Sequence, residues 1–214
     1  MHEINMDISS IFISLVIGYL LGSIPFGLLL AKAFGQGDIR DIGSGNIGAT
    51  NVLRTGRKDI AALTLLLDAG KAGIAGLIVG HFIGAPYAFI AAASAFLGHC
   101  FPVWLKFKGG KGVATFFGAL LALVWPVGLI AAITWLIIAF VTRYSSLAAL
   151  WAAGLAPIAA LLLGYQNAAF MSAFMALLIF MRHRENIGRL IKGEESKIGG
   201  SKAKASETQT SDTP

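Results

Sequence analysis

Charged side chains are scarce in this sequence. Of its 214 residues, 13% are charged and 56% are hydrophobic, whereas a soluble domain has about 25% charged residues. The mean hydropathy is +0.74. A helix needs about 20 apolar residues to cross a bilayer core of about 30 Å, and several runs approach or exceed that length. These features exclude an ordinary soluble protein and predict an all-α integral membrane protein. The runs are 8–31, 60–101, 112–142 and 144–181.

Cysteine is nearly absent as well. Cys100 is alone, so it can form no intrachain disulfide, and it belongs to no zinc-binding or redox pattern. No histidine and carboxylate cluster has the spacing of metal ligands, and we expect neither a metal nor a cofactor. The net charge of +6 lies between and after the apolar runs, without an aromatic-interleaved groove. It therefore indicates membrane topology and anionic ligands, and no nucleic acid.

The positions of lysine and arginine predict the topology. The first helix, about 8–31, is followed by a basic segment, 32–59, which the positive-inside rule places in the cytoplasm. Two further helices, about 60–80 and 85–101, return the chain to the same side. The next loop, 102–111, is basic again, as that return requires.

The run 112–142 is one long tilted helix or two short ones hinged at Trp125 and Pro126. We favour two helices of about 14–16 residues, which a thinned bilayer could accommodate, because they return the basic C-terminal segment to the cytoplasm. A turn at 164–167 then separates the last two helices. The resulting fold is a bundle of seven transmembrane helices with the N-terminus outside and the C-terminus cytoplasmic. Counts of five or six helices remain open.

Residues 1–195 are expected to form a single membrane-embedded domain, followed by a polar tail, 196–214. That tail has almost no apolar residues and is predicted to be disordered. No internal repeat of the kind found in many transporters is visible.

Asp68 and Lys71 are charged residues inside the second predicted helix, three positions apart and so on one face. Each is costly in a membrane. The pair either neutralises itself and fixes helix packing, or Lys71 reaches a buried anionic ligand while Asp68 holds it. Lys71 is therefore a secondary candidate for substrate binding.

Three polar segments are placed on the cytoplasmic side by this topology. The first, 43–56, reads GSGNIGATNVLRTG and contains the G-x-G-x-x-G spacing. A dinucleotide site is excluded, because no strand precedes the segment and no βαβ unit fits a helical membrane chain. The small residues instead predict a loop rich in backbone and side-chain donors, with Arg54 close by.

The second segment, 98–115, contains Gly109-Gly110-Lys111-Gly112 just before an apolar helix. Free backbone amides, a positive helix end and a lysine favour phosphate binding. The spacing is not that of a Walker A loop, so nucleotide hydrolysis is not expected. A basic interfacial loop anchored by Trp104 and Phe107 is the alternative.

The third segment, 182–196, reads RHRENIGRLIKGEES. His183, Asn186 and Leu190 share one helical face, with Arg189 close to Asn186 in the next turn. A positive-inside anchor explains the arginines but not the histidine and asparagine three residues apart.

With these segments the chain resembles the bacterial acyl-phosphate:glycerol-3-phosphate acyltransferase (PlsY) family. The match covers SGNIGATN from Ser44, GHCFPVWLKFKGGKGVAT from Gly98, and H-x-x-N-I-x-R-L-x-x-G-x-E from His183. The resemblance implies transfer of a fatty acyl group from acyl phosphate to the 1-hydroxyl of glycerol 3-phosphate. The products would be lysophosphatidic acid and phosphate, at the start of phospholipid biosynthesis. Neither acyl-CoA nor acyl carrier protein is expected as direct donor.

The resemblance also implies a seven-helix fold in the bacterial plasma (inner) membrane, with a cytoplasmic active site. An enzyme that supplies acyl phosphate is a possible partner. The alternative function is a membrane transporter of an organic phosphate, for which internal repeats and polar residues on several helices would be expected.

Site residues follow from the same resemblance, motif by motif. Ser44, Asn186 and His183 are the catalytic candidates. Thr115, the last residue of the second signature, and Glu195 are candidates for substrate binding. Glu195 is expected to order the third motif by pairing with a basic neighbour. We favour a mechanism in which the acyl phosphate takes the proton and His183 binds and orients, although His183 as general base remains open. Glycerol 3-phosphate would be surrounded by Ser44, Arg54, Lys111, His183 and Asn186, a phosphate cradled by Gly109, Gly110 and Gly112, and the pocket lined by Asn46, Thr50 and Asn51.

Overall fold

The computed structural model describes residues 7–43 and 45–199. All regular elements in these two ranges are helical, which confirms the predicted all-α class. Three short 3-10 helices, η1 (Ile39–Asp41), η2 (Leu53–Thr55) and η3 (Val103–Leu105), lie in connections. The α-helices in these ranges are α1 (Ile8–Gly22), α2 (Phe26–Ala33), α3 (Ala49–Val52), α4 (Lys58–Phe82), α5 (Ala85–Cys100), α6 (Val113–Leu123), α7 (Trp125–Thr142), α8 (Ser145–Leu162), α9 (Gln166–Arg182) and α10 (Arg184–Ile191).

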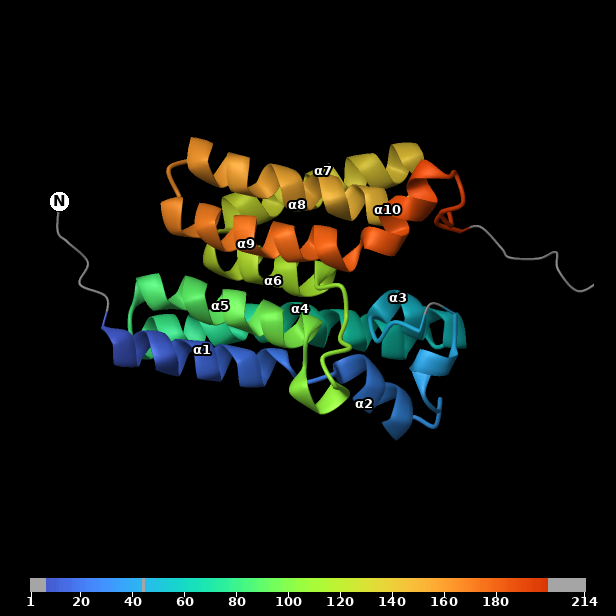
Figure 1. Cartoon of the computed structure of the whole chain (residues 1–214), viewed down its shortest axis with the longest axis horizontal. Coiled ribbons are helices and arrows are strands. Elements are labelled where there is room, and N and C mark those ends of the chain that lie inside the picture. The colour runs from blue at the N-terminus through green and yellow to red at the C-terminus, as the bar shows by residue number, and fades with distance from the viewer. Residues whose placement is uncertain (1–6, 44, 200–214) are drawn as a thin grey trace, which may run out of the picture.

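The long helices lie side by side in a bundle, nearly parallel to its long axis (Figure 1). α1 packs on α5, and α4 lies against both α5 and α6. α7, α8 and α9 follow one another in antiparallel contact, and α9 returns to α5. Short α2, α3 and α10 gather at one end, the right-hand end in Figure 1.

Within residues 7–43 and 45–199, five helical segments are long and apolar enough to cross a membrane, and two apolar helices, α6 and α9, are shorter. A count of seven crossings therefore depends on these two shorter helices. The five segments are Ile8–Ala33, Lys58–Phe82, Ala85–Leu105, Trp125–Thr142 and Ser145–Leu162.

Small residues let the helices approach closely. A Cβ on Gly22 would lie 1.9 Å from the carbonyl oxygen of Ala95, and one on Gly118 would lie 1.8 Å from that of Ala69. The largest core cluster consists mainly of alanine. Van der Waals contact between small side chains is the way in which helices associate within lipid, where burial of apolar surface provides little driving force.

The first helix differs from its prediction as one continuous helix over 8–31, because the structure breaks it after Gly22. Pro25 lacks an amide hydrogen and disfavours helical geometry at the preceding residue. The carbonyls that the break leaves without helical partners receive side-chain donors instead. Trp104 Nε1 donates to the carbonyl of Ser23 at 2.7 Å, and Lys71 Nζ donates to that of Ile24 at 3.1 Å.

The run 112–142 is divided, as we favoured, into α6 and α7, with the hinge at Val124. Their lengths are 11 and 18 residues, rather than the nearly equal lengths predicted. Pro126 fits the first turn of α7, where its missing amide hydrogen costs nothing. The turn between α8 and α9 lies at 163–165, one or two residues before the predicted position.

Candidate functional site

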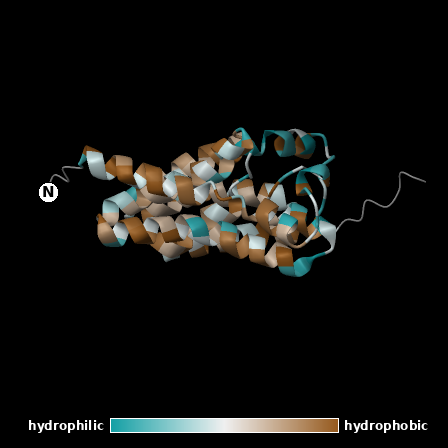
Figure 2. Ribbon diagram, turned by 90° about the horizontal axis from the view of Figure 1, so that it is seen from below, coloured by the Kyte–Doolittle hydropathy of each residue, from teal (hydrophilic) through white to brown (hydrophobic). Residues whose placement is uncertain are grey.

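The described parts of the three polar segments lie toward one end of the bundle (Figure 1). Residues 45–56 surround α3, residues 102–112 link α5 to α6, and residues 183–195 contain α10. Most of the hydrophilic ribbon gathers at the same end (Figure 2). The prediction that the helix order brings these segments to one face therefore agrees with the structure. Ser44 lies outside the described residues.

His183 forms the junction between α9 and α10 and is buried. Its Nδ1 lies 2.8 Å from the carbonyl oxygen of Ile179. Because a carbonyl can only accept, Nδ1 carries the proton, and Nε2 of the neutral ring is an acceptor. Burial lowers the pKa of His183 to about 4, the charge of Lys111 adds to this effect, and the bond to Ile179 opposes it.

Asn186 joins the second and third polar segments. Its Oδ1 accepts a hydrogen bond from Lys111 Nζ at 2.5 Å, and its Nδ2 donates to Glu195 Oε1 at 2.5 Å. The amide is thus oriented by a cation on one side and a carboxylate on the other. Burial lowers the pKa of Lys111 below its ordinary value, and the charge of Arg189 acts in the same direction.

Glu195 is held by three side chains. Besides Asn186, Ser146 donates to its Oε1 at 2.7 Å, and Arg189 Nε donates to its Oε2 at 2.7 Å. Burial alone would raise the pKa of Glu195, but these hydrogen bonds hold it below its ordinary value. The pairing with a basic neighbour was predicted, whereas the contact with Ser146, at the start of α8, was not.

The glycine segment differs from the expectation of free amides at Gly109 and Gly110. Their N–H groups donate to the carbonyls of Cys100 and His99, at 3.1 and 3.0 Å. A Cβ on Gly110 would lie 2.2 Å from His99 Nε2. These two glycines are therefore needed for the close packing of the loop on the end of α5.

In the described loop, backbone amides without a hydrogen-bond partner begin at Lys111, directly after Gly110. Within the described residues, the amides of Lys111 and Gly112 have no hydrogen-bond partner, nor do the first amides of α6. The hydroxyl of Thr115, in the first turn of α6, is also buried without a partner. A helix N-terminus with free amides and an adjacent lysine attracts anions.

Arg182 fastens this loop from the end of α9. Its Nη2 donates to the carbonyl of Gly109 at 2.6 Å and its Nε to that of Gly110 at 3.0 Å. Its guanidinium also lies 5.4 Å from the ring centroid of Phe101. Sequence reasoning treated Arg182 as one of several topological arginines, and nothing in its spacing distinguished it.

The first polar segment shows fewer contacts with the others. Asn51 is buried and donates to the carbonyl of Ile39 at 2.6 Å, and Arg54 Nη1 lies 3.3 Å from Asn51 Oδ1. Asn46 is partly buried and Thr50 is exposed. In the described residues, no hydrogen bond or ion pair joins Arg54 to Lys111 or His183.

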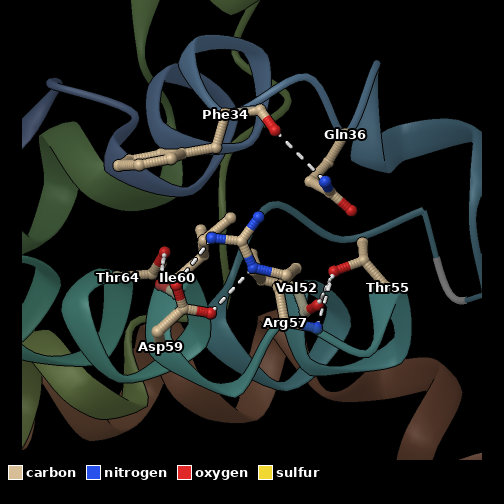
Figure 3. Close-up of polar contacts among 8 residues, drawn as sticks. All are labelled: Phe34, Gln36, Val52, Thr55, Arg57, Asp59, Ile60 and Thr64. Carbon is tan, nitrogen blue, oxygen red and sulfur yellow. Dashed lines mark hydrogen bonds and ion pairs between the residues drawn. The ribbon is translucent and has the colours of Figure 1, made fainter.

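Arg57, which follows the first polar segment, contacts residues on both sides of it along the chain (Figure 3). It forms two hydrogen bonds with Asp59, at 2.9 and 2.6 Å, and its guanidinium lies 5.7 Å from the ring centroid of Phe34. The contact joins the chain just after α2 to the start of α4. It therefore brings together the two ends of the connection that holds Asn51 and Arg54.

Lys71 and Asp68 are both buried and form an ion pair of 2.8 Å. His99 Nδ1 lies 3.6 Å from the same carboxylate oxygen. Because Lys71 also donates to the carbonyl of Ile24, two of its three hydrogens already have partners inside the protein. This geometry fits the packing alternative better than the alternative in which Lys71 reaches a buried anionic ligand. Among residues 7–43 and 45–199, no three His, Cys, Asp or Glu side chains gather as metal ligands would.

Comparison with known proteins gives one consistent result. A model of the family described as "Glycerol-3-phosphate acyltransferase" matches residues 12–193. A protein of that name from Maricaulis maris is 62% identical, over 88% of either chain. One from Caulobacter vibrioides is 61% identical, over 94% of either chain.

Solved structures agree in fold as well as sequence. A crystal structure of PlsY, "an integral membrane glycerol 3-phosphate acyltransferase", in its glycerol 3-phosphate form is 41% identical, with a TM-score of 0.83. The match covers 89% of this chain and 96% of that one. The lysophosphatidic acid form has a TM-score of 0.80 and 40% identity, over 88% and 95% of the two chains.

Proposed function

The chain belongs to the glycerol-3-phosphate acyltransferase family, and on this premise we propose that its acyl donor is an acyl phosphate. It is a multi-pass integral membrane enzyme of phospholipid synthesis that transfers an acyl group to glycerol 3-phosphate. The products of the proposed reaction are lysophosphatidic acid, which is bound in one related structure, and inorganic phosphate.

The chain of contacts from Lys111 through Asn186 to Glu195 is the observation that supports this site best. It brings a lysine, an oriented amide and the free amides at the start of α6 to one place. Substrate and donor both carry phosphate, so the site must hold two anions close together. Charge-assisted hydrogen bonds from lysine, arginine and backbone amides are suited to that task.

We propose that the phosphate lies against the amides of Lys111 and Gly112 and the first turn of α6, near the hydroxyl of Thr115. Gly109 and Gly110 contribute by shaping the loop rather than by donating. Residues of the first segment would complete the pocket when substrate binds. The remaining candidates for contact with glycerol 3-phosphate are Ser44, Asn46, Thr50, Asn51, Arg54, His183 and Asn186, with Glu195 as a positioning residue and Lys71 supporting the fold from behind.

In the proposed reaction, the 1-hydroxyl oxygen attacks the carbonyl carbon of the acyl phosphate, and the bond from that carbon to the phosphate oxygen breaks. The hydroxyl proton passes to an oxygen of the departing phosphate. The geometry of His183 leaves Nε2 as an acceptor for a substrate hydroxyl. Its pKa of about 4 makes it a weak base near neutral pH, which supports a binding and orienting role.

For the topology, we propose seven crossings, with the N-terminus outside and the active site on the cytoplasmic side of the bacterial plasma membrane. Residues 1–195 would form one catalytic domain. The clustering of basic segments at one end of the bundle supports this arrangement. The predicted disordered tail lies largely outside the described residues.

The donor is tested with purified protein, glycerol 3-phosphate and three matched donors: acyl phosphate, acyl-CoA and acyl carrier protein. We expect lysophosphatidic acid from acyl phosphate only. Product from acyl-CoA at a similar rate would contradict the proposed donor. A failure to form product with any donor, together with glycerol 3-phosphate flux in liposomes, would instead favour the transporter.

His183 is tested in the same assay through His183→Gln and His183→Ala. Gln can keep a hydrogen bond to substrate without acting as a base, so we expect His183→Gln to retain measurable turnover and His183→Ala to bind glycerol 3-phosphate less well. If turnover is abolished in both variants while substrate binds normally, His183 is the general base.

A further inference from the structure

Among the residues that the structure describes, no side-chain hydrogen bond joins the segment 103–108, between α5 and the glycine loop, to Lys111, Asn186 or Glu195. Its apolar side chains nevertheless face outward: Val103, Trp104 and Phe107 are 49%, 50% and 58% exposed. Two exposed lysines, at 106 and 108, stand among them. In Figure 1 this green connection forms a lobe on the outer side of the bundle, where α1 gives way to α2.

The backbone of this lobe is held in an uncommon conformation. Lys106 and Phe107 have φ angles of 51° and 61°, the left-handed region that residues with a Cβ adopt only at a cost. Hydrogen bonds from the amides of Lys106 and Phe107 to the carbonyls of Val103 and Pro102, each 3.0 Å long, hold the turn. The fold thus maintains a strained turn that leaves Phe107 and both lysines exposed.

Trp104 sets the depth of the lobe along the membrane normal. Its indole donates to the carbonyl of Ser23, at the C-terminal end of α1. α1 has 15 residues, which rise about 22 Å. If α1 begins at one boundary of a hydrocarbon layer about 30 Å thick, it ends within about 8 Å of the other boundary. Tryptophan is enriched at that boundary, where its ring is half in lipid and its N–H finds a polar partner.

The two lysines of the segment add positive charge beside its exposed apolar side chains. In the described part of the chain, neither Lys106 nor Lys108 forms an ion pair. Unpaired cations beside exposed aromatic and aliphatic side chains, at the level of lipid headgroups, attract anionic lipid. A soluble protein partner would not require the tryptophan to be fixed at the depth of the interface.

We propose that residues 103–108 form a membrane-docking loop whose occupant is the anionic surface of the surrounding bilayer. Val103, Trp104 and Phe107 enter the boundary between headgroups and acyl chains, and Lys106 and Lys108 bind the phosphate groups of anionic phospholipids. The loop continues directly into the segment that leads to Lys111. Docking therefore fixes the height of the phosphate site above the lipid in which the acyl donor resides, a consequence that rests on the proposed function.

A direct test uses a fluorophore on Val103→Cys in lipid nanodiscs. Cys100 is fully buried, so it should not compete for label under native conditions. Lys192→Cys, exposed at the end of α10, is the matched control. We expect nitroxide-labelled lipid to quench the label at 103 severalfold more than the label at 192. Quenching at 103 by aqueous iodide but not by lipid nitroxide would overturn the proposal, and this readout needs no turnover.

A second test removes the charges. Lys106→Gln/Lys108→Gln is compared with Lys58→Gln/Lys192→Gln in vesicles of phosphatidylcholine with increasing phosphatidylglycerol. Each lysine near an anionic surface strengthens attraction about fivefold. Phosphatidylglycerol should raise the rate of the wild type and of the control variant by the same factor. We expect that factor to be at least about threefold smaller in the loop variant. Equal responses in all proteins, equal loss in both variants, or a response that appears only with a soluble acyl-phosphate supplier would each overturn the proposal.

Discussion

At the scale of residues, the candidate site depends on an amide held between opposite charges. Asn186 accepts a hydrogen bond from Lys111 through its oxygen and donates one to Glu195 through its nitrogen. Rotating the amide by half a turn, or replacing either of these atoms, would lose a charge-assisted hydrogen bond. Glu195 is in turn held by Ser146 and Arg189. The orientation of Asn186, which we propose as a substrate contact, is thus determined by the residues behind it.

Ser146→Ala tests this support from outside the three polar segments. Loss of its hydrogen bond to Glu195 should loosen Asn186 and lower kcat/KM by up to about tenfold, the equivalent of one hydrogen bond. The measurement is steady-state kinetics with glycerol 3-phosphate varied. Ser145→Ala, one residue away and without a hydrogen bond to Glu195 in the structure, is the control. Equal effects of the two changes would show that Ser146 acts only through α8.

His183 predicts a dependence of stability on pH. Its folded-state pKa is about 4, below the ordinary value of about 6.5. Between these pH values the unfolded chain binds a proton at His183 that the folded protein does not. The contribution of neutral His183 to the free energy of unfolding is therefore complete above about pH 6.5 and is lost as the pH falls toward 4. It amounts to about 3 kcal/mol.

The measurement is thermal unfolding in detergent between about pH 4.5 and 7, the window set by these pKa values. We expect the wild type to lose more stability than His183→Gln as the pH falls. The same slope for both proteins would mean that His183 is not buried in its neutral form.

Sequence patterns pointed to the residues of the proposed site more readily than to the residues that hold them in place. Asn186, Lys111 and Glu195 stand out in segments where a membrane chain has no need of them. Arg182 does not, because an arginine after an apolar helix is common, and only the three-dimensional approach of the glycine loop makes it a clamp. Ser146 lies in another helix, and nothing local in the sequence links it to Glu195.

At the scale of elements, the break between α1 and α2 shows how a membrane helix can be interrupted. Backbone groups without partners are costly in lipid, and here Trp104 and Lys71 satisfy the carbonyls of Ser23 and Ile24. Lys71 also forms an ion pair of 2.8 Å with Asp68 within the bundle. The ion pair therefore stabilises a bend in a neighbouring element.

Lys71→Met removes both functions of this lysine. It removes the lysine partner of buried Asp68 and leaves only His99, whose Nδ1 lies 3.6 Å from the carboxylate, beside it. Losing one member of a buried ion pair costs about 3–5 kcal/mol. We expect a large fall in the unfolding temperature in detergent. Asp68→Asn/Lys71→Gln can keep a neutral hydrogen bond and should be markedly more stable than Lys71→Met. If the double variant is the less stable of the two, charge rather than hydrogen bonding holds the bend.

Apolar runs predicted most helix positions, because hydrophobicity over about 20 residues is a strong signal in membrane proteins. Breaks inside an apolar run are harder to predict. The sequence predicts a hinge at Pro126 because the topology requires one. It predicts no break at Pro25, since a single run of 24 residues already fits one crossing. The signal of this break, a polar Ser23 two residues before the proline, is weak without knowledge of Lys71 and Trp104.

At the scale of the whole molecule, the bundle is apolar along most of its length and polar at one end (Figure 2). The proposed reaction needs this arrangement, because an acyl phosphate donor would be held by the membrane, whereas glycerol 3-phosphate is soluble in water. The polar end contains Lys111, Asn186 and Glu195 next to the helices that could solvate an acyl chain.

Two glycines offer a matched test of the seven proposed crossings. Gly164 and Gly193 have φ angles of 81° and 72°, and a Cβ at either would meet nothing within 4 Å, so Gly164→Cys and Gly193→Cys carry similar strain and little steric cost. Seven crossings put Gly164 outside and Gly193 in the cytoplasm. On intact cells, an impermeant maleimide should label Cys at 164, and at 193 only after permeabilisation. If α6 and α7 together crossed only once, the two positions would exchange sides. The opposite labelling pattern would therefore exclude seven crossings that begin outside, and with them the proposed orientation of the site.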